Sequence, residues 1–179
     1  EAVLPALKWF YTSPTAAGFR ERFVLSAIPV ANPDGWVAGR SGRNLSGGQP
    51  SGRFPPDGTA YRDPKNPEAL YLWRWIGISA PDLVIVLGAG NPPALFVPRD
   101  QLPELDPLEK LGRPLPELPE LASALARHSP CGTGAIPAVR LDVGSRSIPR
   151  QLMVIFKSGF RGPSPARREI QKRLGRTPV

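Results

Sequence analysis

The sequence predicts an α/β protein with a mixed, mostly parallel sheet that is flanked by helices on both faces. Two continuous apolar runs, residues 23–31 and 83–87, have the β-branched bias of buried strands. Helical patterns precede these runs at residues 2–11 and 66–79. Such alternation of helix and strand is typical of α/β folds. The length suits one domain, and we expect it to span residues 1–179.

The first half of the chain contains the clearest pattern. Residues 2–11 have the apolar spacing of a short amphipathic helix, and a second short helix is expected at residues 16–20. The apolar run 23–31 is broken by the Asn-Pro-Asp-Gly turn sequence of residues 32–35. Residues 37–63 then show no periodicity, and an unstructured loop of this length is usually functional or disordered.

The next helix has a well-defined start. Asn66 is a suitable N-cap and Pro67 suits the first helical position, so we expect a helix that continues to about Ser79. The second apolar run, residues 83–87, follows this helix and leads into a glycine-rich exit at residues 88–90. The order through residue 90 is therefore helix, strand, long loop, helix and strand.

The second half of the chain is less regular. Residues 98–121 are rich in proline, glutamate and leucine and repeat Leu-Pro-Glu-Leu at irregular spacing, so we interpret them as an excursion beyond the sheet. A helix is expected at about residues 118–127, and two further strands at 136–143 and 152–156. Residues 163–179 form a basic C-terminal segment that begins with a predicted helix.

Composition excludes several classes of protein. The 24 prolines predict short helices and long loops. Cys131 is the only cysteine, so neither an internal disulfide nor a cysteine-based zinc cluster can form. No apolar run is long enough to span a membrane, and no signal peptide is visible, so the sequence indicates no compartment.

The beginning of the chain is unusual for a complete protein. It opens with Glu1 inside a predicted helix, and its only methionine is Met153. We therefore expect residues 1–179 to be a piece of a longer product, in which further sequence precedes Glu1.

The net charge of +8 is concentrated near the C-terminus. Residues 1–139 hold 13 basic and 13 acidic residues, whereas residues 140–179 hold 10 basic and 2 acidic residues. Such a segment can attract nucleic acid or anionic surfaces, or it can be a solvated helix. No aromatic residue lies among the basic residues of 163–179, which disfavours stacking on bases and hence nucleic acid as the partner.

Four motifs occur in a fixed order in the first half of the chain. They are IPVANPDGW at residues 28–36, GRN at 42–44, RFP at 53–55 and NPEALYLW at 66–73. This ordered set resembles the zinc carboxypeptidases of the carboxypeptidase A superfamily, over about residues 1–90. The resemblance implies their α/β fold and the zinc-assisted hydrolysis of a C-terminal peptide bond or a related amide bond. The implied partner is a peptide or a small carboxylate-bearing substrate.

The same resemblance implies roles for two arginines. Arg43 best matches an arginine near the scissile carbonyl, with Arg40 as the alternative, and Arg53 matches the arginine that grips the carboxylate of the substrate. Arginine suits this task because its planar fork holds a carboxylate with two parallel hydrogen bonds. The family's partner asparagine is replaced by Gly52. Both arginines can also be interpreted as solvent-facing residues of a loop.

The zinc site that the resemblance implies is incomplete in this chain. Its His-x-x-Glu pair would precede the first helix, so Glu1 is either the ligand glutamate or an ordinary first-turn glutamate. The third ligand is expected after residues 83–87, where the chain has Leu-Gly-Ala-Gly. The catalytic glutamate is expected within residues 152–158, where Phe156 or Lys157 stands. Without it, no general base for a metal-bound water is evident.

Two further patterns have simpler interpretations. Gly88 and Gly90 follow a buried strand as in a dinucleotide-binding turn, but two prolines stand where the helix should begin. His128 and Cys131 could form a base and a nucleophile, yet their spacing alone supplies neither an orienting group nor an oxyanion site. A helix end with a glycine-rich exit explains this second pattern equally well.

Three functional hypotheses remain open from the sequence. The first is a zinc-dependent carboxypeptidase in which Arg53 and Arg43 bind the substrate carboxylate. The second is a catalytically inactive carboxypeptidase-like module that keeps the arginine pocket without zinc. The third is a protein that associates with anions or nucleic acid through the basic segment 163–179.

Overall fold

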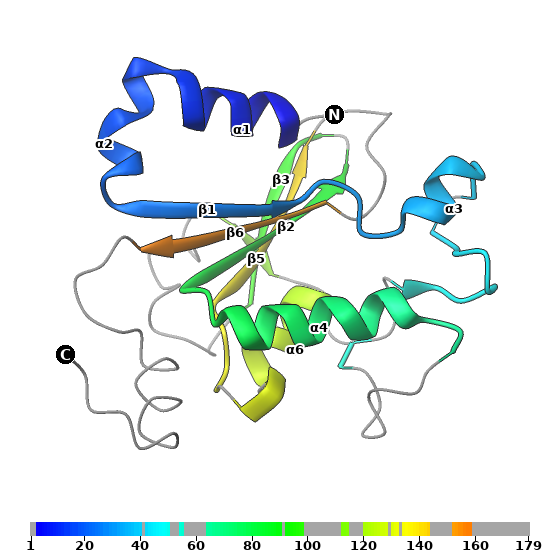
Figure 1. The fold of residues 1–179 in the computed structure, drawn as a ribbon. Coiled ribbons are helices and arrows are strands. Elements are labelled where there is room, and N and C mark those ends of the chain that lie inside the picture. The colour runs from blue at the N-terminus through cyan, green and yellow to red at the C-terminus, as the bar shows by residue number, and fades with distance from the viewer. Residues whose placement is uncertain are drawn as a thin grey trace.

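The described residues form a six-stranded mixed sheet with helices on both faces (Figure 1). It is seen in a computed structural model that describes residues 3–40, 42–50, 54–55, 64–90, 92–98, 112–114, 120–128, 130–132, 134–143 and 152–158. Sequence reasoning predicted the α/β class and the mixed sheet correctly.

The helices follow the predicted order. They are α1 (Val3–Thr12), α2 (Ala17–Arg20), α3 (Pro33–Val37), α4 (Pro67–Ser79) and α6 (Leu121–Arg127), with short 3-10 helices η1 (Pro14–Ala16) and η4 (Pro130–Gly132). Helix α4 begins at Pro67 as predicted, and Asn66 occupies the N-cap position, but its side chain makes no capping hydrogen bond. The turn sequence after the first strand forms the short helix α3, because Asn32 caps it and Pro33 opens it.

The strands are β1 (Phe23–Ile28), β2 (Leu83–Ala89), β3 (Ala94–Val97), β4 (Arg113–Pro114), β5 (Ala138–Val143) and β6 (Leu152–Ser158). Their order across the sheet is β1-β6-β2-β5-β3-β4. Strands β3 and β4 were not predicted, because both are short and prolines lie directly beside or within them.

The prediction of a mostly parallel sheet is wrong. Only the β2·β5 and β3·β4 pairs are parallel, whereas β1·β6, β6·β2 and β5·β3 are antiparallel. The physical reason is long-range: β6, the last of the described strands, enters between β1 and β2 and runs against both, as its arrow in Figure 1 shows. Local sequence patterns contain no information about such an insertion.

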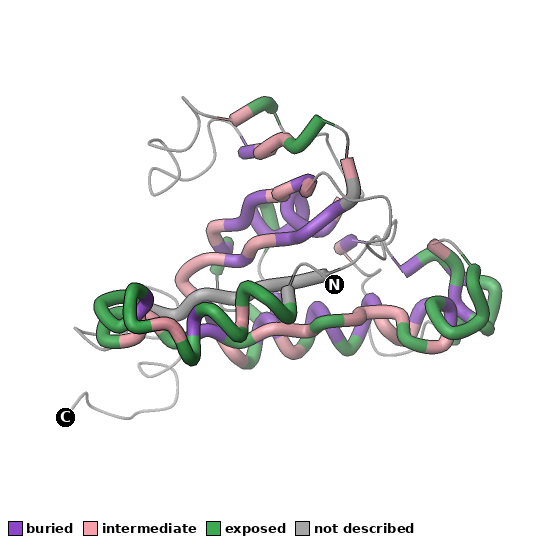
Figure 2. The backbone as a smooth tube through the Cα atoms, turned by 90° about the horizontal axis from the view of Figure 1, so that it is seen from above, coloured by how far each residue is buried: buried purple, intermediate pink, exposed green. Residues whose placement is uncertain are grey.

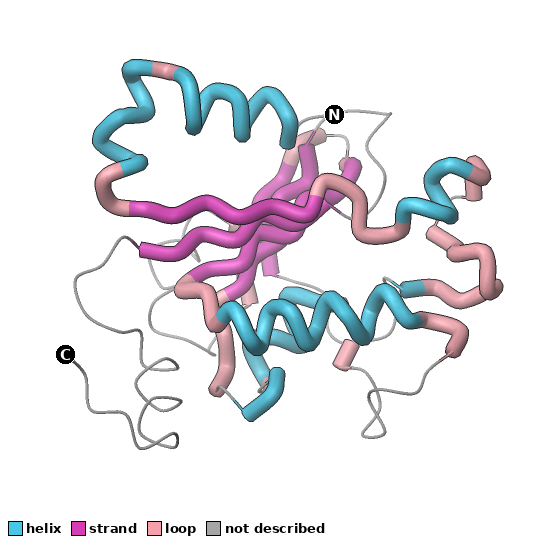
Figure 3. The backbone as a smooth tube through the Cα atoms, in the orientation of Figure 1, coloured by secondary structure: helices cyan, strands magenta, loops and turns pink. Residues whose placement is uncertain are grey.

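Helices cover both faces of the sheet, as predicted (Figure 3). Val84 and Val86 of β2 belong to a core cluster with α4 and α6. Leu87, the residue directly after Val86, packs with Phe10 of α1 on the opposite face. Alternate side chains of a strand point to opposite faces, so β2 is buried on both sides.

Strand β1 differs from its prediction as a strand buried on both faces. It is the edge strand of the sheet, and Val24 is 56% exposed. Leu25 is buried in the cluster with α1, so only part of the strand is covered. A continuous apolar run cannot distinguish a central strand from an edge strand that is partly covered by a helix.

Candidate functional site

Three strands end at the same edge of the sheet. Strands β1 and β2 each run antiparallel to β6, and β5 runs parallel to β2, so all three point in one direction. The loop after β1, the glycines at the end of β2 and Asp142 near the end of β5 therefore lie along one edge. Open α/β folds place their ligand sites beyond such carboxyl ends.

Asn32 joins the turn after β1 to the backbone of Arg43. Its Oδ1 accepts a hydrogen bond from the Gly35 N–H at 3.1 Å, and its Nδ2 donates to the Arg43 carbonyl at 3.0 Å. A Cβ on Gly35 would overlap the same carbonyl, so glycine allows the two segments to approach closely. The turn motif and the arginine motif, eleven residues apart, are thus held together.

Asp34 adds a second link between these segments. Its Oδ2 accepts a hydrogen bond from the Leu45 N–H at 3.0 Å. This hydrogen bond is the main reason why the pKa of the Asp34 carboxyl is lowered, against a smaller opposing effect of desolvation. The ionised form of Asp34 therefore helps to hold residues 43–45 against α3.

Asn44 is fully buried and connects this loop to α4. Its Nδ2 donates to the Lys65 carbonyl at 2.6 Å and to Glu68 Oε2 at 2.8 Å. Its Oδ1 accepts from the Gly48 N–H at 2.8 Å. Sequence reasoning treated Asn44 only as part of a motif, although a buried asparagine with three hydrogen bonds determines the position of its loop.

The structure places Arg43 but not Arg53. The Arg43 side chain is exposed, and within the described part of the chain its guanidinium has no hydrogen-bond or ion-pair partner. Arg40, the alternative, is exposed too. Arg53 lies outside the described residues, but the next residue, Phe54, is 3% exposed and packs against Trp73 of α4 with ring centres 6.1 Å apart.

The loop that carries Arg43 contains both buried and exposed residues (Figure 2). Gly35, Asn44 and Phe54 are buried, whereas Arg43 and its neighbour Leu45 are exposed. A solvent-facing arginine and a carboxylate-binding arginine are therefore both compatible with this geometry, because the Arg43 side chain is exposed and has no partner among the described residues.

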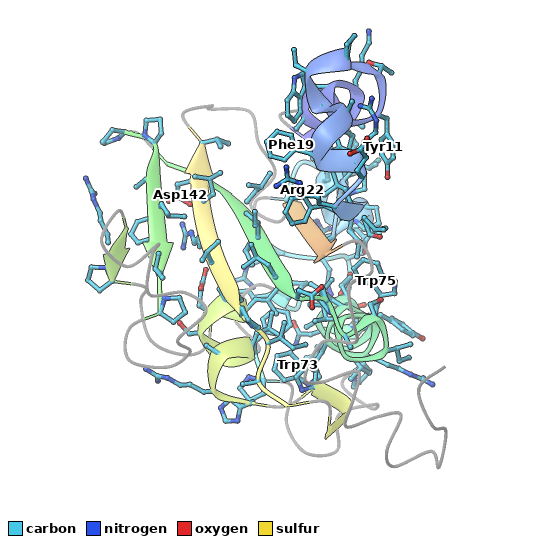
Figure 4. The ribbon with its side chains drawn as sticks, turned by 90° about the vertical axis from the view of Figure 1, so that its left-hand side faces the viewer. Tyr11, Phe19, Arg22, Trp73, Trp75 and Asp142 are labelled. Carbon is cyan, nitrogen blue, oxygen red and sulfur yellow. The ribbon has the colours of Figure 1, made fainter. Side chains whose placement is uncertain are left out.

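Arg140 and Asp142 form an ion pair near the carboxyl ends of β2 and β5. Arg140 Nε donates to Asp142 Oδ1 at 2.7 Å and Nη2 donates to Oδ2 at 3.0 Å, which is a two-pronged arrangement. Asp142, labelled in Figure 4, is only 6% exposed. The guanidinium also lies 5.5 Å from the centre of the Phe96 ring on β3.

Glu120, directly before α6, faces the same arginine. Arg140 Nη1 lies 3.5 Å from Glu120 Oε1. Burial raises the pKa of the Glu120 carboxyl, and the charge of Arg140 opposes this rise. Sequence reasoning missed this cluster, whose only local signal was a basic and an acidic residue at alternate positions of a predicted strand.

The described residues do not fit the zinc site that the resemblance implies. The third ligand is expected at residues 88–90, but a Cβ on Gly88 would overlap Asp142 Oδ1, and a Cβ on Gly90 would lie 2.6 Å from Oδ2. Among the described residues, no three His, Cys, Asp or Glu side chains are grouped to hold a metal ion. Glu1 lies outside the described residues.

The structure describes the remaining predicted features only in part. His128 is exposed at the end of α6, and Cys131 lies in η4. The basic segment 163–179 lies outside the described residues, as does most of the excursion 98–121. Within the described part of the chain, no helix has the length and apolar character needed to cross a membrane.

Comparisons with models of known protein families, with curated proteins and with solved structures find no significant match. The resemblance to zinc carboxypeptidases therefore rests on the ordered motifs of residues 28–73.

Proposed function

We propose that this chain is a carboxypeptidase-like domain that binds the free carboxylate of a peptide or a small molecule through Arg43 and Arg53. The observation that carries the proposal is the state of Arg43. Its backbone is held by Asn32 at the carboxyl edge of the sheet, and its guanidinium is exposed and unpaired within the described residues.

This arrangement reduces the cost of binding. The hydrogen bonds of Asn32, Asp34 and Asn44 hold residues 43–48 before any ligand arrives. Less backbone entropy is then lost on binding, so more of the interaction energy appears as affinity. A guanidinium at this position can donate two parallel hydrogen bonds to a carboxylate.

The test compares a short acetylated peptide that ends in a free carboxylate with the same peptide ending in an amide, by isothermal titration calorimetry. The acid should bind more tightly than the amide. Arg43→Gln should weaken binding of the acid by roughly 10-fold to 100-fold, as expected when a charge-assisted hydrogen bond is lost. Arg22→Gln is the matched control. Arg22 is an exposed arginine directly before the start of β1, and the loop with Arg43 follows the other end of that strand (Figure 4). Equal binding of acid and amide would refute the proposal.

Zinc-dependent hydrolysis is the second candidate function, and the ordered motifs of residues 28–73 favour it. We would measure zinc stoichiometry by mass spectrometry of metals on the full gene product, together with a carboxypeptidase assay. One tightly bound zinc per chain with release of a C-terminal residue would support hydrolysis. No zinc above background, with preserved binding of the acid, would leave carboxylate recognition without zinc.

A further inference from the structure

We propose that the Arg140 guanidinium acts as a built-in cation near the carboxyl ends of β2 and β5. By this inference, Arg140 holds the place between Asp142 and Glu120 that a divalent cation would otherwise take. The inference concerns a different part of the sheet edge from Arg43 and does not depend on carboxylate binding there.

Two carboxylates from distant parts of the chain converge on this one cation. Asp142, near the end of β5, contacts Arg140 through two hydrogen bonds of 2.7 and 3.0 Å. Glu120, which precedes α6, lies 3.5 Å from a third nitrogen of the same guanidinium. One positive charge thus lies between two negative charges, as a metal ion would between carboxylate ligands.

The strand next to this pair leaves room for it. Gly88 is the register partner of Asp142 in the parallel pair of β2 and β5. A Cβ on Gly88 would overlap Asp142 Oδ1 and would lie 3.1 Å from Arg140 Nε. The glycine therefore leaves the space that the ion pair occupies, and a ligand side chain at this position would displace the pair.

Burial makes the positive charge necessary. Asp142 is almost fully buried, and the side chains of Glu120 and Arg140 are only 20% and 29% exposed. If the guanidinium is removed, two carboxylates remain close together with little water to separate their charges. A divalent cation with oxygen ligands could then compensate them.

The test uses thermal unfolding of the full chain with EDTA, and with millimolar Ca²⁺, Mg²⁺ or Zn²⁺ added singly. We expect that none of these cations changes the Tm of the wild-type protein by binding between Asp142 and Glu120. Arg140→Met should lower the Tm by roughly 10 °C, and a divalent cation should restore a few degrees of it. Arg140→Lys, which keeps the charge, should show no cation response. Arg113→Met is the control, because Arg113 is an exposed arginine on β4.

A double variant keeps the test decisive if Arg140→Met does not fold. Arg140→Met combined with Asp142→Asn removes one charge of each sign and should be more stable than Arg140→Met alone. Three results would overturn the inference. The first is a rise of the wild-type Tm with a divalent cation that Asp142→Asn abolishes. The second is an Arg140→Met variant that is as stable as wild type or whose Tm does not respond to any cation. The third is a double variant that is no more stable than Arg140→Met.

Discussion

Replacing Gly88 with alanine should destabilise this protein through a single added methyl group. The new Cβ would overlap Asp142 Oδ1 and would press on Arg140 Nε at 3.1 Å. The backbone of Gly88 does not adopt a positive φ, so the cost arises from this overlap and not from backbone strain. To admit the methyl group, the carboxylate must move away from the guanidinium to which it is bonded at 2.7 Å.

The size of the effect follows from the burial of the pair. Disrupting a buried ion pair by removing one partner costs about 3–5 kcal/mol. Arg140 is 29% exposed, so water can compensate part of the loss, and the two side chains can adjust. We therefore expect the free energy of unfolding to fall by about 2–4 kcal/mol, or the Tm by roughly 5–15 °C.

Chemical denaturation followed by circular dichroism measures this difference directly. Gly18→Ala is the matched control, because Gly18 lies in α2 and a Cβ there would meet no other atom within 4 Å. The control should be neutral or slightly stabilising, since alanine favours the helix by up to about 1 kcal/mol. If Gly88→Ala lies within about 0.5 kcal/mol of wild type, the ion pair does not occupy this space as described.

Two further predictions concern polar groups that the fold buries. Asn44→Ala should lower the free energy of unfolding by about 2–4 kcal/mol because three hydrogen bonds of a buried side chain are lost, and an equally stable variant would contradict the role of Asn44 in holding the loop. Burial raises the pKa of Glu120, so this carboxyl binds more protons in the folded state than in the unfolded state. Its contribution to the free energy of unfolding therefore falls as the pH rises from the unfolded pKa through the folded pKa. Glu120→Gln should therefore lose less stability than wild type over that rise, and parallel pH profiles of unfolding would refute this.

Local sequence was sufficient where the structure depends on neighbouring residues. The helix that begins at Pro67 was predicted because a proline favours the first position of a helix, whereas the capping hydrogen bond expected from Asn66 does not form. Strands β1 and β2 were predicted from their own apolar runs. The hydrogen bond from Asn32 to the carbonyl of Arg43 was not predicted, because it joins residues eleven positions apart.

The tertiary structure alone decided which elements meet. The insertion of β6 between β1 and β2 pairs residues that are far apart in the chain, such as Ile28 with Met153 and Leu87 with Leu152. Both of these strand pairs are antiparallel. Trp36 is 57% exposed because α3 extends away from both core faces (Figure 1). Asp142 is buried because the strand beside it has glycine at the facing position and Arg140 supplies the opposite charge. Charge compensation of this kind depends on the distances between charged side chains in the folded chain. The spacing of residues along the sequence does not predict these distances.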